Sequence, residues 1–378
     1  MAPPCAGVPG WRVGRAWVPR SGEYTGVPVT ATPSEATRAH EDLVTLGDIQ
    51  RAATGLSGIT VRTPLLPFGR PVAGDPRGHP RTWIKPESLQ PIGAFKLRGA
   101  WTAVSSLGPA ERSRGVVAHS SGNHAQGVAR AARLLGVPAV IVMPADAPAV
   151  KVAGVRADGA EIVFVGTSSD ERVAMAERLV AERGLGLIPA YDDPRIIAGQ
   201  GTCGLEIVDQ VAELGYSDEP LTVLVPIGGG GFAAGVATAV KALRPDARVF
   251  GVEPELAADA AESLRTGAVV RWGPELVGRT AADGMRTNAV GAIPFRHLQA
   301  YLDGVVTVSE TDIARAMVRG AREARLVMEP SGATTVAALL FDPGIAAAPG
   351  HVVAIVSGGN VDPARYEQLI AEGIAAGG

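Results

Sequence analysis

Residues 115–144, GVVAHSSGNHAQGVARAARLLGVPAVIVMP, contain the pattern that decides the fold. The runs GVVAHS and AVIVMP are short and rich in apolar and β-branched residues, which favours strands. Between them, NHAQGVARAARLLG has apolar residues at helical spacing. A strand, a helix and a second strand in this order are typical of the βαβ unit of a parallel sheet.

The same alternation continues along the chain. Further strand-like runs lie at 161–166, 221–227, 247–254, 304–310 and 351–359. Amphipathic helix patterns separate them, so we predict an α/β protein with two doubly wound, open-sheet domains. The predicted segments are a small α/β domain at 115–192, a large domain made of 43–114 and 193–378, and a disordered extension at 1–42.

Composition limits the kinds of partner. Charged residues make up 19% of the 378 residues and the formal net charge is −3, so nothing electrostatic favours nucleic acid or an anionic membrane. Cys5 and Cys203 are the two cysteines, which predicts no disulfide framework and a cytoplasmic location. No apolar run approaches the ~20 residues that a membrane-spanning helix needs. The expected ligand is a small molecule.

Four consecutive glycines follow the predicted strand LTVLVPI: Gly228, Gly229, Gly230 and Gly231. Glycines let backbone N–H groups converge, and the following helix adds positive potential at its N-terminus, so this turn predicts a phosphate site. A rival interpretation stays open. Gly228, Gly230 and Ala233 approximate the GxGxxG/A pattern, and Glu253 lies near the expected position of a ribose-binding acid. By itself the turn does not exclude a dehydrogenase or a non-catalytic nucleotide-binding protein.

Lys96 lies between Phe95 and Leu97 in the string KPESLQPIGAFKLRGA, residues 85–100. A lysine in a desolvated site has a lowered pKa and can act as an imine-forming amine. A solvated surface position is the ordinary alternative for a single lysine.

The string at 85–100 closely resembles the cofactor-lysine motif of the fold-type II enzymes that use pyridoxal 5′-phosphate (PLP), specifically the serine/threonine dehydratase branch with the threonine ammonia-lyases and serine racemases. Further motifs of this family follow in order: SSGNHAQG (120–127), IAGQGTCGLEI (197–207), PIGGGG (226–231), GVEP (251–254), TAADG (280–284), EPSGA (329–333) and SGGNVD (357–362). They cover nearly everything from Thr45 to Asp362. Gln90 and the triplet KLR at 96–98 favour the dehydratases over the cysteine synthase relatives.

This resemblance implies a tryptophan synthase β-like architecture in which the large domain binds PLP. It implies that Lys96 is the Schiff-base lysine and the general base that removes the Cα proton. The four glycines would hold the phosphate, Asn123 would contact the 3′ oxygen, Glu329 would lie near the ring, and Ser357 would hydrogen-bond the pyridine nitrogen. The alternatives are an acid at a helix N-terminus for Glu329 and a simple turn residue for Ser357.

The resemblance also assigns the turn at 120–124 to the substrate carboxylate. Its residues are Ser120, Ser121, Gly122, Asn123 and His124. Unpaired N–H groups at a helix start suit an anion, but helix capping by Ser120 and Asn123 is the alternative. His124 is expected to be structural. Ser121 is a second candidate catalytic residue, because serine racemases and hydroxyaspartate dehydratases carry Ser at the matching position, where many biosynthetic threonine dehydratases have Ala. The resemblance implies that its hydroxyl would lie on the face opposite Lys96, return a proton there and invert Cα.

Glu253, Ala257 and Asp259 match the ExxxAxD pattern that some serine racemases and related dehydratases use for Mg²⁺ or another divalent cation. Two carboxylates, a backbone carbonyl and waters suit a hard cation. The alternative is a charged helix start or loop. No pair of histidines has zinc-ligand spacing such as HExxH.

The implied function is that of a PLP-dependent lyase, which converts a β-hydroxy amino acid to a 2-oxo acid and ammonia. L-threonine, L-serine or both are the expected substrates. Serine racemase and 3-hydroxyaspartate dehydratase are the alternatives within the family. The expected partners are the amino-acid substrate and, from the family alone, a second copy of the chain in a homodimer.

Overall fold

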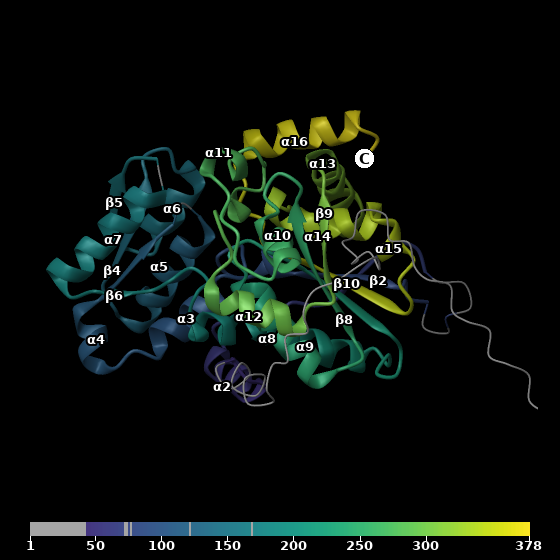
Figure 1. Cartoon of the computed structure of the whole chain (residues 1–378), viewed down its shortest axis with the longest axis horizontal. Helices are drawn as coiled ribbons and strands as arrows, with labels where there is room; N and C mark the ends of the chain where they lie inside the picture. The colour runs from purple at the N-terminus through teal and green to yellow at the C-terminus, as the bar shows by residue number, and fades with distance from the viewer. Residues whose placement is uncertain (1–42, 72–74, 76–77, 121, 168) are drawn as a thin grey trace, which may run out of the picture.

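The computed structural model describes residues 43–71, 75, 78–120, 122–167 and 169–378. They contain one sheet of six strands and one of four (Figure 1). In spatial order, the larger sheet consists of β1 (Leu66–Phe68), β2 (Thr82–Pro86), β10 (His351–Val356), β7 (Leu221–Pro226), β8 (Arg248–Pro254) and β9 (Gly304–Val308). The smaller sheet consists of β5 (Glu161–Val165), β4 (Ala139–Pro144), β3 (Val116–His119) and β6 (Gly186–Leu187). The prediction of an α/β fold with two open sheets is confirmed.

Helices alternate with these strands along the chain. The α-helices are α2 (Leu46–Leu56), α3 (Leu97–Ser105), α4 (Pro109–Arg114), α5 (Asn123–Leu135), α6 (Ala149–Ala157), α7 (Ser169–Arg183), α8 (Pro194–Glu213), α9 (Gly231–Leu243), α10 (Asp259–Thr266), α11 (Pro274–Val277), α12 (Ala292–Tyr301), α13 (Glu310–Arg319), α14 (Pro330–Phe341), α15 (Pro343–Ala346) and α16 (Pro363–Ala375). Short 3₁₀ turns form η1 (Glu87–Leu89) and η2 (Asp283–Met285), and a π-helical turn forms η3 (Gly320–Ala324).

The larger sheet is mostly parallel. β10 returns to its centre and pairs in parallel with β2 on one side and β7 on the other, whereas β1 joins β2 as an antiparallel edge. Every residue of β7 and β10 is buried. Nearly continuous apolar strands of this kind are expected where helices cover both faces of a parallel sheet.

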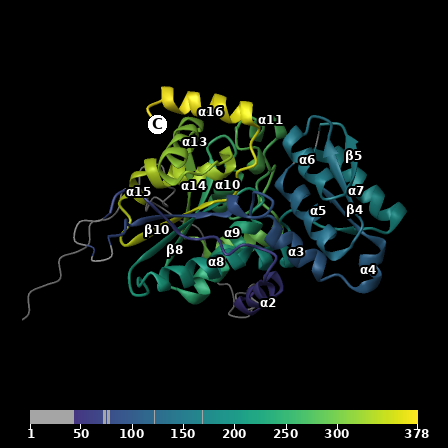
Figure 2. The same cartoon turned by 180° about the vertical axis from the view of Figure 1, so that it is seen from behind.

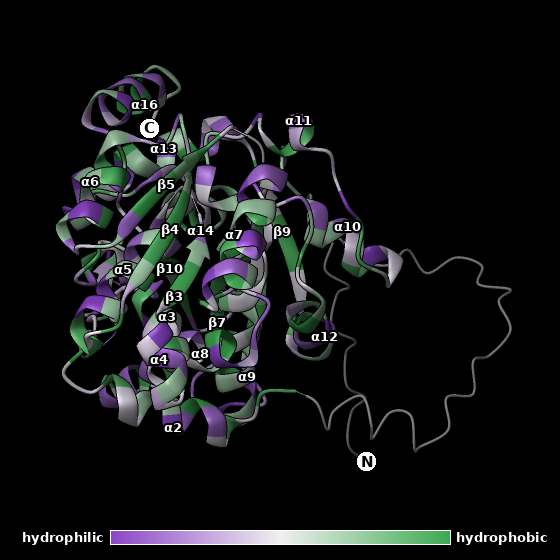
Figure 3. Cartoon of the chain, turned by 90° about the vertical axis from the view of Figure 1, so that its left-hand side faces the viewer, coloured by the Kyte–Doolittle hydropathy of each residue, from purple (hydrophilic) through white to green (hydrophobic). Residues whose placement is uncertain are grey.

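Alternate residues of β10 face different helix layers. Val353 and Ile355 belong to the core that contains α8 and α9, whereas Val352 and Ala354 belong to the core that contains α13 and α14. This follows from the two-residue period of a strand. Figure 1 shows α8, α9 and α12 on one side of the larger sheet and α13, α14 and α16 on the other. Figure 3 shows the hydrophobic strands between helices with hydrophilic outer faces.

Helix α3 lies where the two sheet-and-helix units meet. It packs against α5 of the smaller unit and α8 of the larger unit (Figure 2). Because α3 begins directly after Lys96, this packing places Lys96 between the two sheets. All strands of the smaller sheet lie between residues 116 and 187, but the domain boundaries themselves remain predictions. Among the described residues, no helix has the length and apolar character needed to cross a membrane.

Candidate active site

A cavity of about 850 Å³ lies at the carboxyl ends of strands from both sheets, where α/β folds bind their ligands. Its wall includes Lys96, Ser120, Gly122, Asn123, His124, Gly228, Gly229, Gly230, Gly231, Glu329 and Ser357. The structure therefore brings together all the described residues that the sequence assigned to the cofactor and to the substrate carboxylate. Ser121 lies outside the described residues.

Lys96 is partly buried at the N-cap position of α3. Its Nζ donates a hydrogen bond to the carbonyl oxygen of Ala190 over 2.9 Å and lies 5.2 Å from the centre of the Phe95 ring. Burial lowers the pKa of the Lys96 amine from 10.5 to about 8, because the charged form loses hydration. More of the amine is then neutral near pH 7, which favours nucleophilic chemistry at Nζ.

The glycine turn leaves no room for side chains. A Cβ on Gly229 would lie 2.1 Å from Cδ1 of Tyr191, and a Cβ on Gly231 would lie 2.7 Å from the Tyr191 carbonyl oxygen. Gly230 has a φ of +89°, which residues with a side chain rarely adopt. Since α9 begins at Gly231, the turn is a backbone cradle at a helix N-terminus, and it fits a phosphate.

The turn before α5 differs from a capped helix start. The N-cap is Gly122, which has no side chain that could cap the helix. The Oγ of Ser120 accepts a hydrogen bond from the Gly122 N–H over 3.1 Å. The Asn123 amide is used elsewhere: its Nδ2 donates to Oε1 of Glu329 over 2.6 Å, and its Oδ1 accepts from Nδ2 of Asn360 over 2.9 Å. Capping therefore does not explain Asn123, and the first N–H groups of α5 suit an anion.

His124 is a buried, neutral side chain. Its Nε2 donates to the Ile188 carbonyl oxygen over 3.0 Å. Burial and the nearby Lys96 charge lower the pKa of His124 to about 3. A ring that stays neutral and bonds to the backbone fits the structural role expected for it.

Glu329 and Ser357 reach the cavity from the larger unit. Glu329 is the N-cap of α14 but makes no capping bond, so its carboxylate serves Asn123 instead of its own helix. Burial raises the pKa of Glu329 to about 7, against the opposing effect of the nearby Lys151 ammonium. Ser357 follows β10 and is buried, and its Oγ donates a long hydrogen bond of 3.4 Å to the Ser331 carbonyl oxygen. Because this bond is long, the hydroxyl can turn and donate instead to an acceptor of a ligand, such as an unprotonated ring nitrogen.

The predicted cation residues do not line this cavity, although Asp259 lies close to Val290 and Tyr191 of its wall. Glu253 and Asp259 are buried, and the carboxylate oxygens of Glu253 accept the N–H groups of Ala260 and Ala261 over 3.1 and 2.7 Å. Neither oxygen of Asp259 makes a side-chain hydrogen bond, but the backbone N–H groups of Asp259 and Val290 lie close enough to favour the charged carboxylate. Burial raises the pKa of Asp259 to about 7 and, together with the Asp259 charge, raises the pKa of Glu253. Because Glu253 is engaged with α10 outside the cavity, it is poorly placed to bind a ribose.

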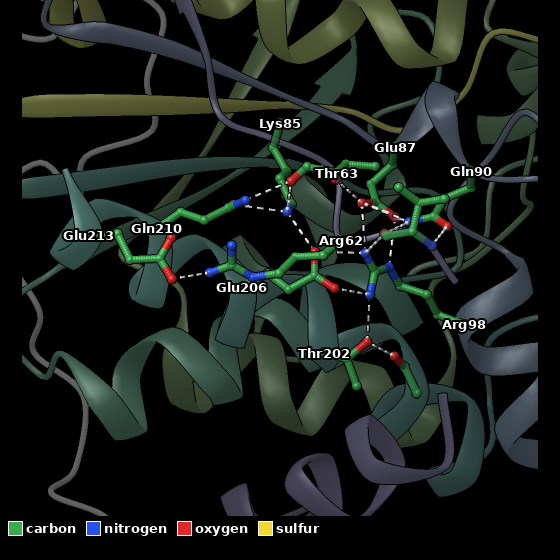
Figure 4. Close-up of polar contacts among 12 residues, drawn as sticks. Arg62, Thr63, Lys85, Glu87, Gln90, Arg98, Thr202, Glu206, Gln210 and Glu213 are labelled. Atoms are coloured by element: carbon green, nitrogen blue, oxygen red, sulfur yellow. Dashed lines mark hydrogen bonds and ion pairs between the residues drawn. The ribbon is translucent and has the colours of Figure 1, made fainter. Parts of the chain in front are cut away.

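A buried ionic network surrounds Arg98, close in sequence to Lys96 (Figure 4). Arg98, two residues further along, donates to Oε2 of Glu87 and Oε1 of Glu206, each over 2.7 Å. Lys85 donates to Oε2 of Glu206 over 2.6 Å. The network joins β2, η1 and α8 to the start of α3, so it fixes the backbone that carries Lys96. The sequence shows that the string at 85–100 contains the charged residues Lys85, Glu87 and Arg98. That these residues are buried and paired with one another and with Glu206 is visible only in the fold.

Two further residues that the sequence motifs did not predict line the cavity. Tyr191 packs against the glycine turn, and Lys151 of α6 forms an ion pair with Asp283 of η2. No local motif marks either residue, because both act through contacts between segments that lie far apart in the sequence.

The fold and the cavity define an α/β enzyme scaffold, and comparison with known proteins identifies its class. The family model described as "Pyridoxal-phosphate dependent enzyme" matches residues 56–358, so the chain belongs to this family. This confirms the resemblance on which the sequence analysis relied.

The relatives narrow the branch. The chain is 39% identical over 327 residues to L-threo-3-hydroxyaspartate ammonia-lyase of Saccharomyces cerevisiae, covering 86% of this chain and 96% of that protein. It is 38% identical over 338 residues to L-threonine ammonia-lyase of Thermotoga maritima, covering 89% and 80%. Among solved structures, the threonine deaminase of T.th. superposes with a TM-score of 0.76 at 43% identity, covering 84% and 99% of the two chains. The serine racemase from Dictyostelium discoideum superposes with a TM-score of 0.75 at 34% identity, with the same coverage.

Proposed function

We propose that this protein is a PLP-dependent ammonia-lyase that acts on a β-hydroxy amino acid, with L-threonine, L-serine or both as substrates. One observation carries the proposal: a single cavity contains both the partly buried Lys96 and the side-chain-free glycine turn. Relatives of the chain named threonine and hydroxyaspartate ammonia-lyases support the same reaction class.

In this proposal Lys96 would hold the cofactor through its ε-amine and, once released by the substrate amine, would remove the Cα proton. The glycine turn would hold the phosphate, and the turn at 120–124 would hold the substrate carboxylate. Asn123, Glu329 and Ser357 would surround the ring. Bound PLP supplies an electron sink for Cα. A neutral partner of the ring nitrogen, such as Ser357, leaves the ring a weaker electron sink than a carboxylate would, which favours elimination over transamination.

A substrate with a second carboxylate, as in 3-hydroxyaspartate, is the second candidate. Arg271 and Arg286 both line the cavity, and guanidinium groups suit carboxylates. Relatives from Saccharomyces cerevisiae and a Pseudomonas species carry the name L-threo-3-hydroxyaspartate ammonia-lyase. The racemase alternative depends on Ser121, and a Schizosaccharomyces pombe relative at 36% identity is named serine racemase.

Product release tests these assignments. Ammonia and 2-oxo acid are measured for the purified, PLP-loaded protein with L-threonine, L-serine and L-threo-3-hydroxyaspartate, and D-serine is sought by chiral chromatography. We expect release from at least one of them, and the order of kcat/KM identifies the substrate. A PLP-loaded protein that releases nothing from any of them would refute the lyase proposal. A protein that binds nucleotide and takes up no PLP would support the non-catalytic alternative.

We also propose that Glu253, Ala257 and Asp259 hold Mg²⁺ or another divalent cation. Two neighbouring buried carboxylates with no cationic side chain among their hydrogen-bond donors are the support, because two buried like charges are costly without a cation. Among the described residues no group of three or more His, Cys, Asp or Glu side chains is arranged for a metal, so waters and the Ala257 carbonyl would complete the site. A homodimer and a cytoplasmic location remain predictions.

A further inference from the structure

Lys151 is a second lysine of the cavity, more deeply buried than Lys96, and the proposed reaction does not use it. It lies in α6 and is 3% exposed. Its Nζ donates a hydrogen bond to Oδ2 of Asp283 and lies 3.8 Å from Oε2 of Glu329. A Cβ on Gly122 would lie 3.4 Å from the same nitrogen. The ammonium therefore lies beside the turn assigned to the substrate carboxylate and the acid assigned to the cofactor ring.

Glu329 is the partner that depends on this charge. Its side chain is 1% exposed, and its Oε2 is buried without a hydrogen bond. Its Oε1 accepts the hydrogen bond from Nδ2 of Asn123 over 2.6 Å. A buried carboxylate with an unpartnered oxygen is unfavourable unless an opposite charge lies close to it. Lys151 provides that charge.

The contacts extend from Glu329 to the Asn123 amide and cross between the two units. Asn123 and Lys151 belong to α5 and α6 beside the smaller sheet. Asp283 belongs to η2, and Glu329 is the N-cap of α14, beside the larger sheet. The other end of the amide is also held, because Oδ1 of Asn123 accepts from Nδ2 of Asn360 over 2.9 Å. Both ends of this amide are thus fixed, and one of them depends on a carboxylate that faces Lys151.

We propose that Lys151 is a positioning residue of this site: its ammonium, held by Asp283, keeps the Glu329 carboxylate turned toward Asn123 and thereby fixes the Asn123 amide beside the cofactor. The inference rests on the proposed function, in which Asn123 contacts the 3′ oxygen of PLP. The charged groups that face Glu329 are Lys151 and Asp283, and its hydrogen-bond donor is Asn123.

A pair of substitutions with opposite expected signs tests this role. Besides burial, the Lys151 charge lowers the pKa of Glu329 and the Asp283 charge raises it. Protonation of Glu329 would loosen its hydrogen bond to Asn123 beside the cofactor, so the absorbance of bound cofactor should change as Glu329 titrates. In Lys151→Met, which keeps the length of the side chain, the pH midpoint of this change should therefore move up by about one unit or more. In Asp283→Asn the midpoint should move down. Lys151→Arg should restore it.

The matched control is Lys241→Met, which removes a distant lysine paired with Asp303 over 2.8 Å and should leave the midpoint unchanged. The titrations use PLP-loaded protein whose folding is verified by circular dichroism. Opposite shifts in Lys151→Met and Asp283→Asn support the inference, and unshifted midpoints in both overturn it. If Lys151→Met does not fold, Asp283→Asn decides alone, because the Asp283 side chain is 32% exposed.

The result also separates this inference from the proposed function. A parent protein without any absorbance from bound PLP would overturn both. A parent protein with that absorbance, together with variants that titrate as the parent does, would overturn the positioning role alone.

Discussion

The rings of Phe95 and Phe232 stack with their centres 3.9 Å apart and an angle of 10° between their planes. Phe95 precedes Lys96, and Phe232 is the second residue of α9, directly after the glycine turn. The stack therefore joins the segment that carries the amine to the segment that forms the phosphate cradle. We infer that it sets the distance between these two parts of the site.

Loss of this stack should weaken both stability and cofactor retention. Phe232→Leu keeps an apolar side chain and should lower the free energy of unfolding by about 1 kcal/mol, the typical value of an aromatic pair beyond its buried area. Urea unfolding and PLP dialysis measure the two effects. Phe68→Leu, at a buried position in the other core, is the control. It should cost stability without loss of PLP, and equal PLP loss in both variants would contradict the role of the stack.

The glycine cradle predicts a steric effect at one position. In Gly229→Ala the new Cβ would lie 2.1 Å from the Tyr191 ring, so the ring or the turn must move and PLP affinity should fall at least about tenfold. Fluorescence titration of the apoprotein measures it. The control is Gly55→Ala in α2, where no neighbouring atom lies within 4 Å of the new Cβ. It should leave PLP affinity unchanged and should leave the free energy of unfolding unchanged or raise it by about 0.5 kcal/mol. Unchanged affinity in Gly229→Ala would remove the cradle assignment.

The network around Arg98 predicts a large stability effect. Arg98→Met leaves the buried Glu87 carboxylate without its ion-pair partner and leaves Glu206 with Lys85 alone, so it should cost about 3–5 kcal/mol in urea unfolding. The contrasting pair is Arg62 with Glu213, whose side chains are 47% and 62% exposed. Arg62→Met should change the free energy of unfolding by less than about 1 kcal/mol. If the two substitutions lowered the free energy of unfolding by similar amounts, burial would not be what makes the Arg98 network stabilising.

The lowered pKa of Lys96 predicts the pH dependence of cofactor uptake. With a pKa of about 8, the amine is mostly protonated at pH 7 and mostly neutral at pH 9, and only the neutral form attacks an aldehyde. The rate at which the apoprotein takes up PLP should therefore rise with pH to a midpoint near 8. Stopped-flow absorbance gives this profile. A midpoint near the ordinary lysine value of 10.5 would show that Lys96 is not desolvated in solution.

Much of this arrangement follows from local patterns. The alternation of β-branched runs and helical spacing specifies parallel strands, and residues at the carboxyl ends of parallel strands meet at one edge. The glycines after β7 and Ser357 after β10 therefore meet at one edge of the larger sheet, and the packing of the two units brings the turn after β3 to the same cavity. The family motifs supplied the chemical roles of these residues.

What the patterns missed depends on packing between distant segments. The Lys151–Asp283 pair joins residues 132 positions apart, and Tyr191 meets the glycine turn although the segment from α8 to β7 separates them in sequence. The pattern ExxxAxD likewise does not reveal that Glu253 accepts two N–H groups of α10. Local spacing is the same for a helix-terminal acid and for a cation ligand, so sequence alone leaves that choice open.

The central claim is that Lys96 carries the cofactor, and peptide mapping tests it most directly. The PLP-loaded protein is treated with borohydride, which fixes the lysine-bound cofactor, and is then digested and analysed by mass spectrometry. The account predicts a cofactor adduct on the peptide that contains Lys96, and loss of both the adduct and turnover in Lys96→Ala. An adduct on another lysine, with Lys151 as the nearest rival in the cavity, or no adduct in a protein that is active, would contradict it.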